Sequence, residues 1–119
     1  MKWYTEKHLW LEEKDDGTLE VGITSQGDDL MGGIQYAGVA DGMIEVESVK
    51  SYEQIEVPVT GVLHGIEAVH MVPALNDHWD ESKSIGWYDR GYVIDAAKVM
   101  DRKAYLKMCF GETCDTSDL

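Results

Sequence analysis

Two segments in the middle of the chain alternate apolar and polar residues with a period of two, which is the pattern of a half-buried β-strand. They cover residues 43–49 and 53–63, and in both, isoleucine or valine alternates with glutamate. This period predicts one face toward a core and one acidic face toward solvent. Pro58 lacks a backbone N–H, so it places the second strand at a sheet edge or at a bulge.

Weaker alternation and turn residues predict further β structure along the rest of the chain. Additional strands or extended segments are expected at 3–11, 18–24, 34–36, 61–72 and 91–95. The first two form a hairpin, because Asp15-Asp16-Gly17 between them is typical of a tight turn. The polar segment 73–87 is expected to be a loop.

Helical signals are short and lie in two places. Residues 25–33 predict one helical turn that is capped by Ser25 and stopped by two glycines. Residues 96–110 predict a terminal helix, for which Asp95 or Asp101 can be the cap; Asp101 can also begin a second helical segment. The apolar stripe expected on this helix consists of Ala96, Val99, Met100, Leu106 and Phe110.

Many short strands followed by one helix favour a small barrel or sandwich. We therefore expect a single domain over residues 1–110, in which 1–95 form the β-sandwich and 96–110 the terminal helix. Residues 111–119 form an acidic tail.

The composition narrows the possible partners. The 119 residues include 10 Lys and Arg against 23 Asp and Glu, so the formal net charge is −13. Nucleic-acid and anionic-membrane binding need clustered cations, and we predict neither. No apolar segment approaches the ~20 residues of a membrane-spanning helix. We expect a cytoplasmic protein that is a monomer.

Metal and redox motifs are weak in this chain. The histidines do not fall at a spacing that puts two of them side by side on one strand face. Cys109 and Cys114 have no second pair with which to form a structural metal site, although they could form a disulfide.

Lys50 is the residue that could carry chemistry. It lies in "VKSY", between the two best strands, where no Asn-Gly or Gly-Gly marks an ordinary hairpin turn. Glu47 and Glu53 flank it on the two strands. An exposed turn lysine of this kind is well placed for covalent modification by a ligase, although composition alone favours a plain solvated charge.

Ordered motifs along the chain resemble those of one family. These are "YTEKHLW" (4–10), "VGIT" (21–24), "LMGGI" (30–34), "VESVKS" (46–51), "PVTG" (58–61), "PALN" (73–76), "GW" (86–87) and "MDRKAYLKMC" (100–109). In this order they resemble the H protein of the glycine cleavage system, a member of the biotinyl/lipoyl-carrier superfamily. "VESVKS" is the most specific, since it is similar to the lipoyl-attachment motif.

The resemblance implies a mainly β fold, the flattened lipoyl-domain sandwich with a C-terminal helix. It implies lipoic acid in amide linkage to Lys50 and a carrier that is not itself an enzyme. The attachment motif and hairpin are Val46, Glu47, Ser48, Val49 and Ser51. The implied partners are a lipoate ligase or lipoyl transferase, a pyridoxal-phosphate-dependent glycine decarboxylase, an aminomethyltransferase and dihydrolipoyl dehydrogenase.

Three departures from the family pattern affect which chemical group the lipoyl-lysine arm is expected to carry. The segment from Gly33 to Lys50 is shorter than in the family, so the sheet there is expected to be trimmed. Leu9 and Gln54 stand where the family has acidic residues, although Glu53 is adjacent, and these three residues are candidates for the cleft that receives the arm. The alternative function is that of an H-like lipoate-binding protein of another pathway, either bacterial sulfur oxidation or lipoyl relay.

Overall fold

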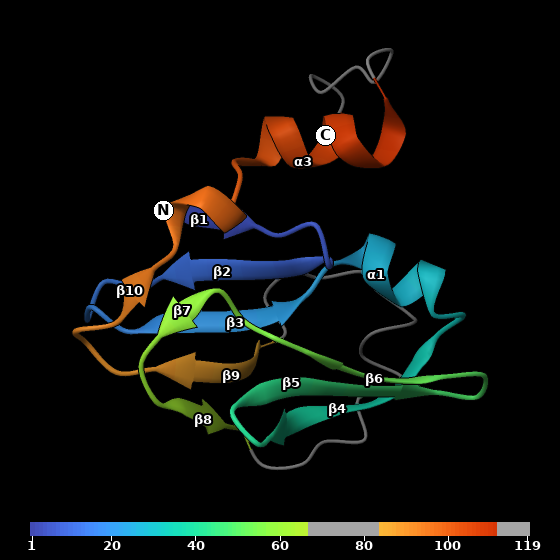
Figure 1. Cartoon of the computed structure of the whole chain (residues 1–119), viewed down its shortest axis with the longest axis horizontal. Helices are drawn as coiled ribbons and strands as arrows, with labels where there is room; N and C mark the ends of the chain where they lie inside the picture. Colours follow the sequence, from blue (N-terminus) through green and yellow to red (C-terminus); the bar gives the residue numbers. More distant parts are fainter. Residues whose placement is uncertain (67–83, 112–119) are drawn as a thin grey trace.

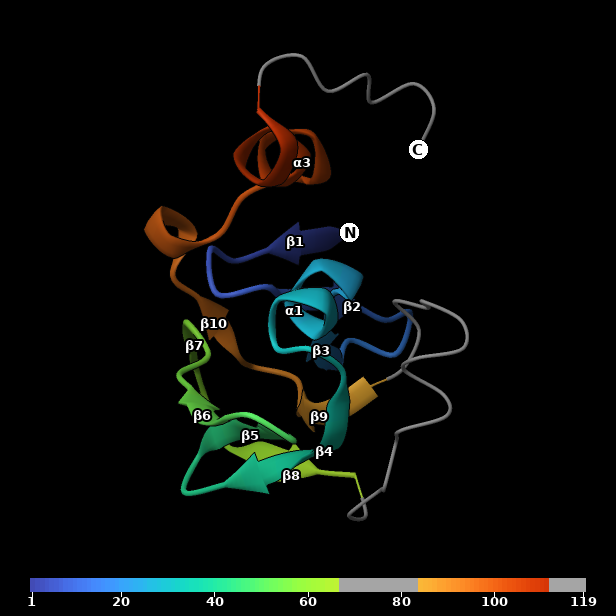
Figure 2. The same cartoon turned by 90° about the vertical axis from the view of Figure 1, so that its right-hand side faces the viewer.

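The computed structural model describes residues 1–66 and 84–111. Its largest sheet is antiparallel, with the strand order β1-β2-β3-β9-β8. These strands are β1 (Lys2–Tyr4), β2 (Leu9–Glu13), β3 (Leu19–Ile23), β9 (Ser84–Tyr88) and β8 (Leu63–Gly65). A second antiparallel sheet has the order β4 (Ile34–Ala40), β5 (Met43–Ser48) and β6 (Tyr52–Ile55). The mainly β fold with a C-terminal helix is confirmed (Figures 1 and 2).

The main core contains the apolar faces of both sheets. The members of this core are Leu9, Leu11, Leu19, Val21, Ile23, Ile34, Ala37, Ile44, Val46, Ile55, Val57, Ile85 and Tyr88. Ile44 and Val46 are fully buried, while Glu47 of the same strand is exposed. The period-two alternation therefore predicted the inward and outward faces of β5 correctly.

The short segment between Gly33 and Lys50 forms a complete two-stranded hairpin. Strand β4 extends to Ala40, beyond the 34–36 expected, and pairs with β5 as far as Ala40 with Met43. Asp41 and Gly42 connect the two strands with φ angles of 55° and 74°. Positive φ at both central residues is the hallmark of the tight turn that matches strand twist.

Three sequence expectations about the β structure and its first helix need correction. The helix α1 (Ser25–Leu30) is capped by Thr24 rather than Ser25, because the Thr24 side chain accepts from the Gly27 N–H. Residues 84–87 belong to β9 and not to a loop. The segment 91–95 contributes β10 (Val93–Ile94), which pairs with β7 (Val59–Thr60) in a separate ribbon. The remainder of 61–72 and 73–87 lies mostly outside the described residues.

The terminal helix is interrupted rather than continuous over 96–110. A 3-10 helix, Ala96–Lys98, is capped by Asp95, and α3 (Arg102–Phe110) is capped by Asp101, whose carboxylate accepts from Ala104. Between them the chain is extended, because Met100 exchanges two backbone hydrogen bonds of 2.8 Å with Tyr4. Pairing with the edge strand β1 thus breaks the helix.

The face of α3 that packs on the sheet differs from the expected stripe. Tyr105 and Leu106 are buried, whereas Phe110 is 52% exposed. Tyr105 forms a second small cluster with Tyr4 and Trp10 on the side of the sheet opposite the main core. Figures 1 and 2 both show α3 alongside β1 at one end of the molecule. The tail 112–119 lies outside the described residues.

Replacing Gly22 by alanine is expected to destabilise the protein. A Cβ at this position would lie 2.4 Å from two carbons of the fully buried Trp10 ring, so the indole would have to move within a packed cluster. Overpacking of this kind costs about 1–3 kcal/mol. Urea denaturation measures the loss of stability. Gly91→Ala is the comparison for an added methyl group, since a Cβ there meets nothing within 4 Å. The φ of 90° at Gly91 adds backbone strain to that variant. An unchanged midpoint for Gly22→Ala would contradict the packing.

Candidate functional site

Lys50 lies at the tip of the β5–β6 hairpin. Glu47 pairs with Tyr52, and the Ser48 N–H donates to the Ser51 carbonyl at 2.8 Å, so Val49 and Lys50 alone form the tip. Both tip residues are exposed. The turn lacks the positive φ values of an ordinary two-residue hairpin, in agreement with its sequence.

The Ser48 side chain holds this unusual turn together. Ser48 is buried, and its Oγ accepts the N–H of Lys50 at 3.3 Å and the N–H of Ser51 at 3.1 Å. The Ser48 hydroxyl oxygen thereby accepts two backbone N–H groups of the turn, as serine side chains do when they stabilise turns through local hydrogen bonds. The backbone of Lys50 is fixed by the turn, while its ammonium remains in solvent.

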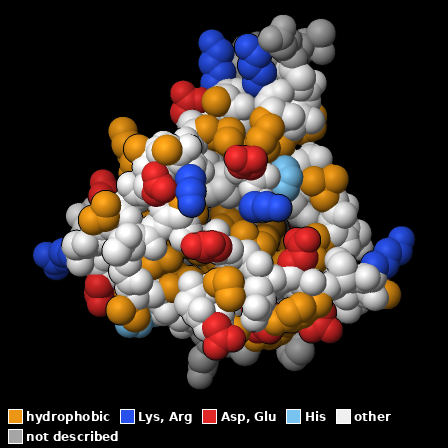
Figure 3. Space-filling model, in the orientation of Figure 1, with side chains coloured by type: hydrophobic (Ala, Val, Ile, Leu, Met, Phe, Trp, Pro, Cys, Tyr) orange, Lys and Arg blue, Asp and Glu red, His pale blue; other side chains and the backbone are white. Residues whose placement is uncertain are grey.

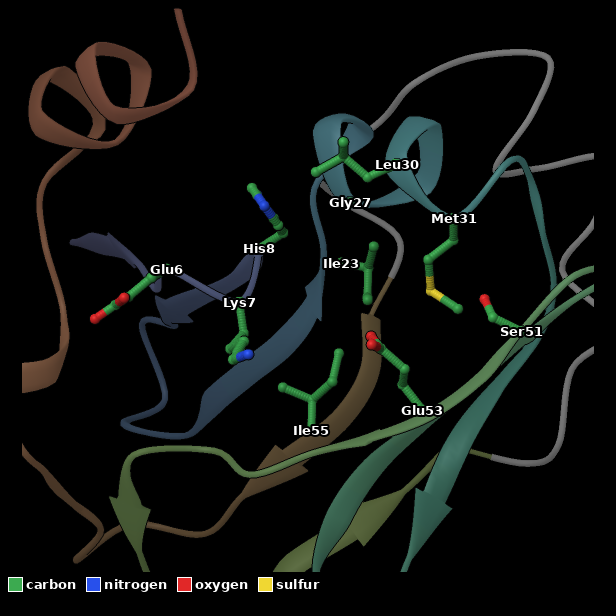
Figure 4. Close-up of a pocket in the computed structure, with 10 residues that line it drawn as sticks. All are labelled: Glu6, Lys7, His8, Ile23, Gly27, Leu30, Met31, Ser51, Glu53 and Ile55. Atoms are coloured by element: carbon green, nitrogen blue, oxygen red, sulfur yellow. The ribbon is translucent and has the colours of Figure 1, made fainter. Parts of the chain in front are cut away.

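A cavity of about 310 Å³ lies between the hairpin and the first helix, and we call it the cleft. Its lining residues are Glu6, Lys7, His8, Ile23, Gly27, Leu30, Met31, Ser51, Glu53 and Ile55. One wall is the loop between β1 and β2, the second is α1 with the end of β3, and the third is β6 (Figure 4). Ser51, the residue that follows Lys50, is part of the third wall.

The cleft combines an apolar bottom with a few charged groups. Ile23 and Ile55 form its inner surface, and Met31 lies beside Ser51 (Figure 4). In the space-filling view, apolar side chains lie at the bottom of a hollow on this face, with charged side chains around it (Figure 3). Lys7 and Glu53 point into the cavity from opposite walls. Half of the lining residues are polar or charged, so the cleft suits a small ligand that has both a hydrocarbon part and a polar group.

Local hydrogen bonds hold the first wall of the cleft, which is the loop between β1 and β2. Thr5 is buried; its carbonyl accepts the His8 N–H at 3.0 Å and its Oγ1 accepts the Leu9 N–H at 3.2 Å. The tight loop puts His8 at a φ of 68°, in the left-handed region. That conformation is uncommon for residues with a side chain, although histidine is enriched in it.

Local interactions also place α1. Asp28 is buried, and its Oδ1 accepts the N–H of Ile34 at 2.7 Å, so the helix is tied to the start of β4. Burial raises the pKa of the Asp28 carboxyl, while the bond from Ile34 acts in the opposite direction. The N-terminus of the helix is capped by Thr24, as described above.

The three candidate cleft residues have different surroundings. Glu53 lines the cleft. Gln54 pairs with Glu45 and, by the alternation of β6, lies on the face opposite Glu53 and Ile55. Leu9 is fully buried in the main core and does not line the cleft. Of the predicted hairpin residues, Val46 and Ser48 are buried, while Glu47, Val49 and Ser51 are exposed.

Several cleft residues are not identified by the sequence pattern. The pattern assigns Lys7 and His8 to an extended segment and residues 25–33 to a short helical turn, whereas the structure places Lys7, His8 and the α1 residues Gly27, Leu30 and Met31 in the lining of the cleft. Their proximity to the hairpin depends on how the two sheets pack, since they precede Lys50 by about 20 to 40 residues. The break in alternation at 5–8 was the available signal for a loop.

His8 is half-buried at the edge of the cleft. Its Nδ1 lies 2.7 Å from the Tyr105 hydroxyl of α3, and its ring meets the Tyr105 ring edge-on with centroids 5.7 Å apart. Burial, with a smaller contribution from the positive charge of Lys7, lowers the pKa of His8 below its ordinary value of 6.5. The neutral imidazole is therefore favoured in the folded protein.

Other chemistry is weaker in the part of the chain that the structure covers. Among residues 1–66 and 84–111, no group of three His, Cys, Asp or Glu side chains could hold a metal ion. Cys109 is a free thiol, and Cys114 lies outside the described residues. No helix in those same ranges is long and apolar enough to cross a membrane.

A β-sandwich that presents a lysine on an exposed hairpin, next to a cleft with an apolar floor and a polar rim, has the features of a small carrier domain. The family model of the glycine cleavage H-protein matches residues 2–78. The chain belongs to this family.

Individual relatives agree with the family match. The chain is 33% identical to the glycine cleavage system H protein of Paraburkholderia phymatum over 116 residues, covering 87% of this chain and 90% of the relative. Identity to the H protein of Vibrio cholerae is 28% over 110 residues, covering 84% and 86%. The crystal structure of a glycine cleavage system H protein from Mycobacterium marinum superposes with a TM-score of 0.68 at 18% identity, covering 90% and 94%, and supports the fold.

Proposed function

We propose that the protein carries a lipoyl group in amide linkage to Lys50 and presents it to partner enzymes as the H protein of a glycine cleavage system. The observation that carries this proposal is the position of Lys50, exposed at a turn that Ser48 holds, beside the cleft. The lipoyl group supplies a redox-active dithiolane at the end of a flexible arm. The protein itself is a carrier and has no catalytic residues of its own.

The cleft fits such an arm. Its volume of about 310 Å³ is at the lower end of small-ligand sites. The apolar side chains of Ile23, Ile55 and Met31 suit a hydrocarbon chain and a dithiolane, which gain by leaving water. A tethered group needs little affinity to occupy an adjacent cleft, because its effective concentration there is high.

Glu53 gives the cleft a preference among cargoes. In glycine cleavage the arm carries an aminomethyl group, which is cationic. A carboxylate that points into the cavity attracts an ammonium there. We propose that Glu53 supplies the acidic group that Leu9 and Gln54 do not, since one is buried in the core and the other lies on the opposite face of β6.

Lys7 is the residue that supports the alternative function. Its ammonium points into the same cleft, where it repels a cationic cargo and attracts an anionic one. This observation favours the alternative that the protein is an H-like carrier of another pathway, such as bacterial sulfur oxidation or lipoyl relay. The two functions differ in which charge on the arm the cleft retains.

The function is tested by the intact mass of the protein after incubation with a lipoate ligase, ATP and lipoate. We expect one lipoyl group per chain, and peptide mapping should place it on Lys50. A protein that gains no mass would overturn the carrier function. Its partners would be the lipoate ligase or lipoyl transferase and, for a glycine cleavage protein, the decarboxylase, the aminomethyltransferase and dihydrolipoyl dehydrogenase. We propose a cytoplasmic monomer.

Glu53→Gln is expected to weaken retention of a cationic cargo. With Cys109 and Cys114 blocked while the arm is oxidised, the two thiols of the reduced arm can be alkylated with bromoethylamine, which attaches stable aminoethyl groups, or with iodoacetamide, which attaches neutral groups. Seating is measured by the change in the methyl resonances of Ile23 and Ile55. For the cationic arm, we expect the seated population to fall by a factor of about 3–10, the effect of losing one charge-assisted interaction.

The neutral arm is the internal control for this variant, because its seating should change little. Lys7→Met should have the opposite effect on the cationic arm. If the wild-type cleft seats the neutral arm and rejects the cationic arm, the glycine cleavage cargo is wrong and the alternative pathway is favoured.

A further inference from the structure

The Tyr105 hydroxyl joins three elements behind the cleft. It lies 2.7 Å from Nδ1 of His8, in the loop between β1 and β2, and 2.6 Å from Oγ1 of Thr24, the N-cap of α1. Its ring stacks on the Tyr4 ring with centroids 4.9 Å apart and planes at 14°. Tyr105 is 3% exposed. The terminal helix thus reaches two walls of the cleft through one side chain.

The hydrogen-bond partners indicate which group donates and which accepts in each of these bonds. Thr24 Oγ1 accepts the Gly27 N–H at 3.2 Å, and it can donate its own hydrogen to the Tyr105 oxygen. The Tyr105 hydroxyl then donates to a neutral His8 Nδ1. This arrangement gives the Thr24 hydroxyl and the Tyr105 hydroxyl each an acceptor. A protonated imidazole would instead donate from Nδ1 to the Tyr105 oxygen, so these hydrogen bonds need a neutral His8. The lowered pKa of His8 agrees with a neutral ring.

The loop and the helix also meet directly at this point. The Thr24 N–H donates to the His8 carbonyl at 3.0 Å. A Cβ added to Gly27 would lie 2.9 Å from Cβ of His8, so the two walls are in close contact. Their separation at the mouth of the cleft depends on this contact and on the orientation of the His8 ring.

We propose that Tyr105 is a positioning residue for the cleft: it fixes the loop that bears Lys7 and His8 against α1, and so sets the shape into which the lipoyl arm fits. This inference rests on the proposed function, because it concerns the arm on Lys50. It assigns to the terminal helix a role in seating the arm, although α3 contributes none of the residues that line the cleft.

The Tyr105→Phe variant tests the proposal, since it removes the hydroxyl and keeps the ring stacked on Tyr4. Lipoylation of Lys50 by the ligase should be unchanged, because the hairpin is separate from this network. With the aminoethylated arm, we expect the seated population to fall roughly two- to tenfold, which corresponds to the loss of one hydrogen bond. The methyl resonances of Ile23 and Ile55 report it.

A second measurement separates positioning from a general loss of structure. The charged and titratable neighbours of His8 given by the structure are Lys7 and Tyr105, while α1 faces it with Thr24 and Gly27. Without the Tyr105 donor, the neutral imidazole loses a stabilising bond, so the pKa of His8 measured by NMR titration should rise toward 6.5. Tyr92→Phe is the matched control, because the Tyr92 hydroxyl bonds Glu13 away from the cleft.

The outcomes are distinct. If Lys50 acquires no lipoyl group, both the function and this inference fail. If the wild-type arm seats in the cleft and Tyr105→Phe seats it equally well, the positioning role is wrong even where the pKa of His8 changes. His8→Asn, which tolerates the left-handed conformation at this position, should reduce seating like Tyr105→Phe, and full seating in this variant would also overturn the proposal.

Discussion

Replacing Lys50 by arginine is expected to abolish lipoylation while leaving the fold intact. The ligase needs a neutral primary amine that attacks the activated carboxyl of lipoate, and the guanidinium of arginine stays protonated and does not form this amide. Lys50 is exposed at the hairpin tip, and the turn is held by Ser48 rather than by the lysine side chain. The variant should therefore have wild-type stability and no added mass.

The control for Lys50→Arg is the same exchange at another exposed lysine. Lys98 lies in the 3-10 helix at the far end of the fold, and Lys98→Arg should be lipoylated to the wild-type extent. Intact mass spectrometry after ligase treatment compares the three proteins. A full lipoyl group on Lys50→Arg would show that another lysine is the acceptor, and the proposed function of the hairpin would be wrong.

Leu9→Glu is expected to unfold most of the protein or to destabilise it by more than about 4 kcal/mol. Leu9 is fully buried among the apolar residues of both sheets, so the variant loses core packing and places a carboxylate where it has no partner. The family resemblance alone would suggest that a glutamate here restores an acid to the cleft. The structure predicts the opposite result, because this side chain points into the core.

Leu30→Glu is the matched control for this variant. It makes the same chemical change on α1, where Leu30 is 65% exposed, and substitutions at such positions usually change stability by less than about 0.5 kcal/mol. Urea denaturation followed by circular dichroism measures both. A Leu9→Glu protein as stable as Leu30→Glu would show that position 9 has access to solvent, and then a cleft role for this residue would have to be reconsidered.

Local patterns predicted much of the sheet and the hairpin. The alternation around Ile44 and Val46 is a backbone property with a period of two, so it identified the buried face of β5 without knowledge of its neighbours. Asp15-Asp16-Gly17 and Asp101 predicted a turn and a cap for the same reason, because each acts within a few residues of its own position. Asp101 also indicates that a second helical segment can begin there, but the pairing of Met100 with Tyr4 was not predictable locally, since Tyr4 is almost a whole chain away.

The cleft shows where local reasoning stops. The family pattern points to positions 9 and 54 and, beside the latter, to Glu53; the structure places Glu53 in the cleft, whereas Leu9 and Gln54 lie outside it. Lys7, His8 and α1 reach the same cavity because the β1–β2 loop and the helix pack beside the hairpin. Whether a residue lines the cleft depends on the strand face that it occupies, and its position in the family motif does not reveal that face.

The sequence by itself determined the mainly β class, the exposed lysine between two amphipathic strands and the family, because short-range periodicity and ordered motifs are written along the chain. The tertiary structure decided which side chains share the cleft and which are buried beneath it. It also brought Tyr105 of the last helix within hydrogen-bonding distance of His8 and Thr24. Such contacts depend on the packing of distant segments in three dimensions, which no local pattern encodes.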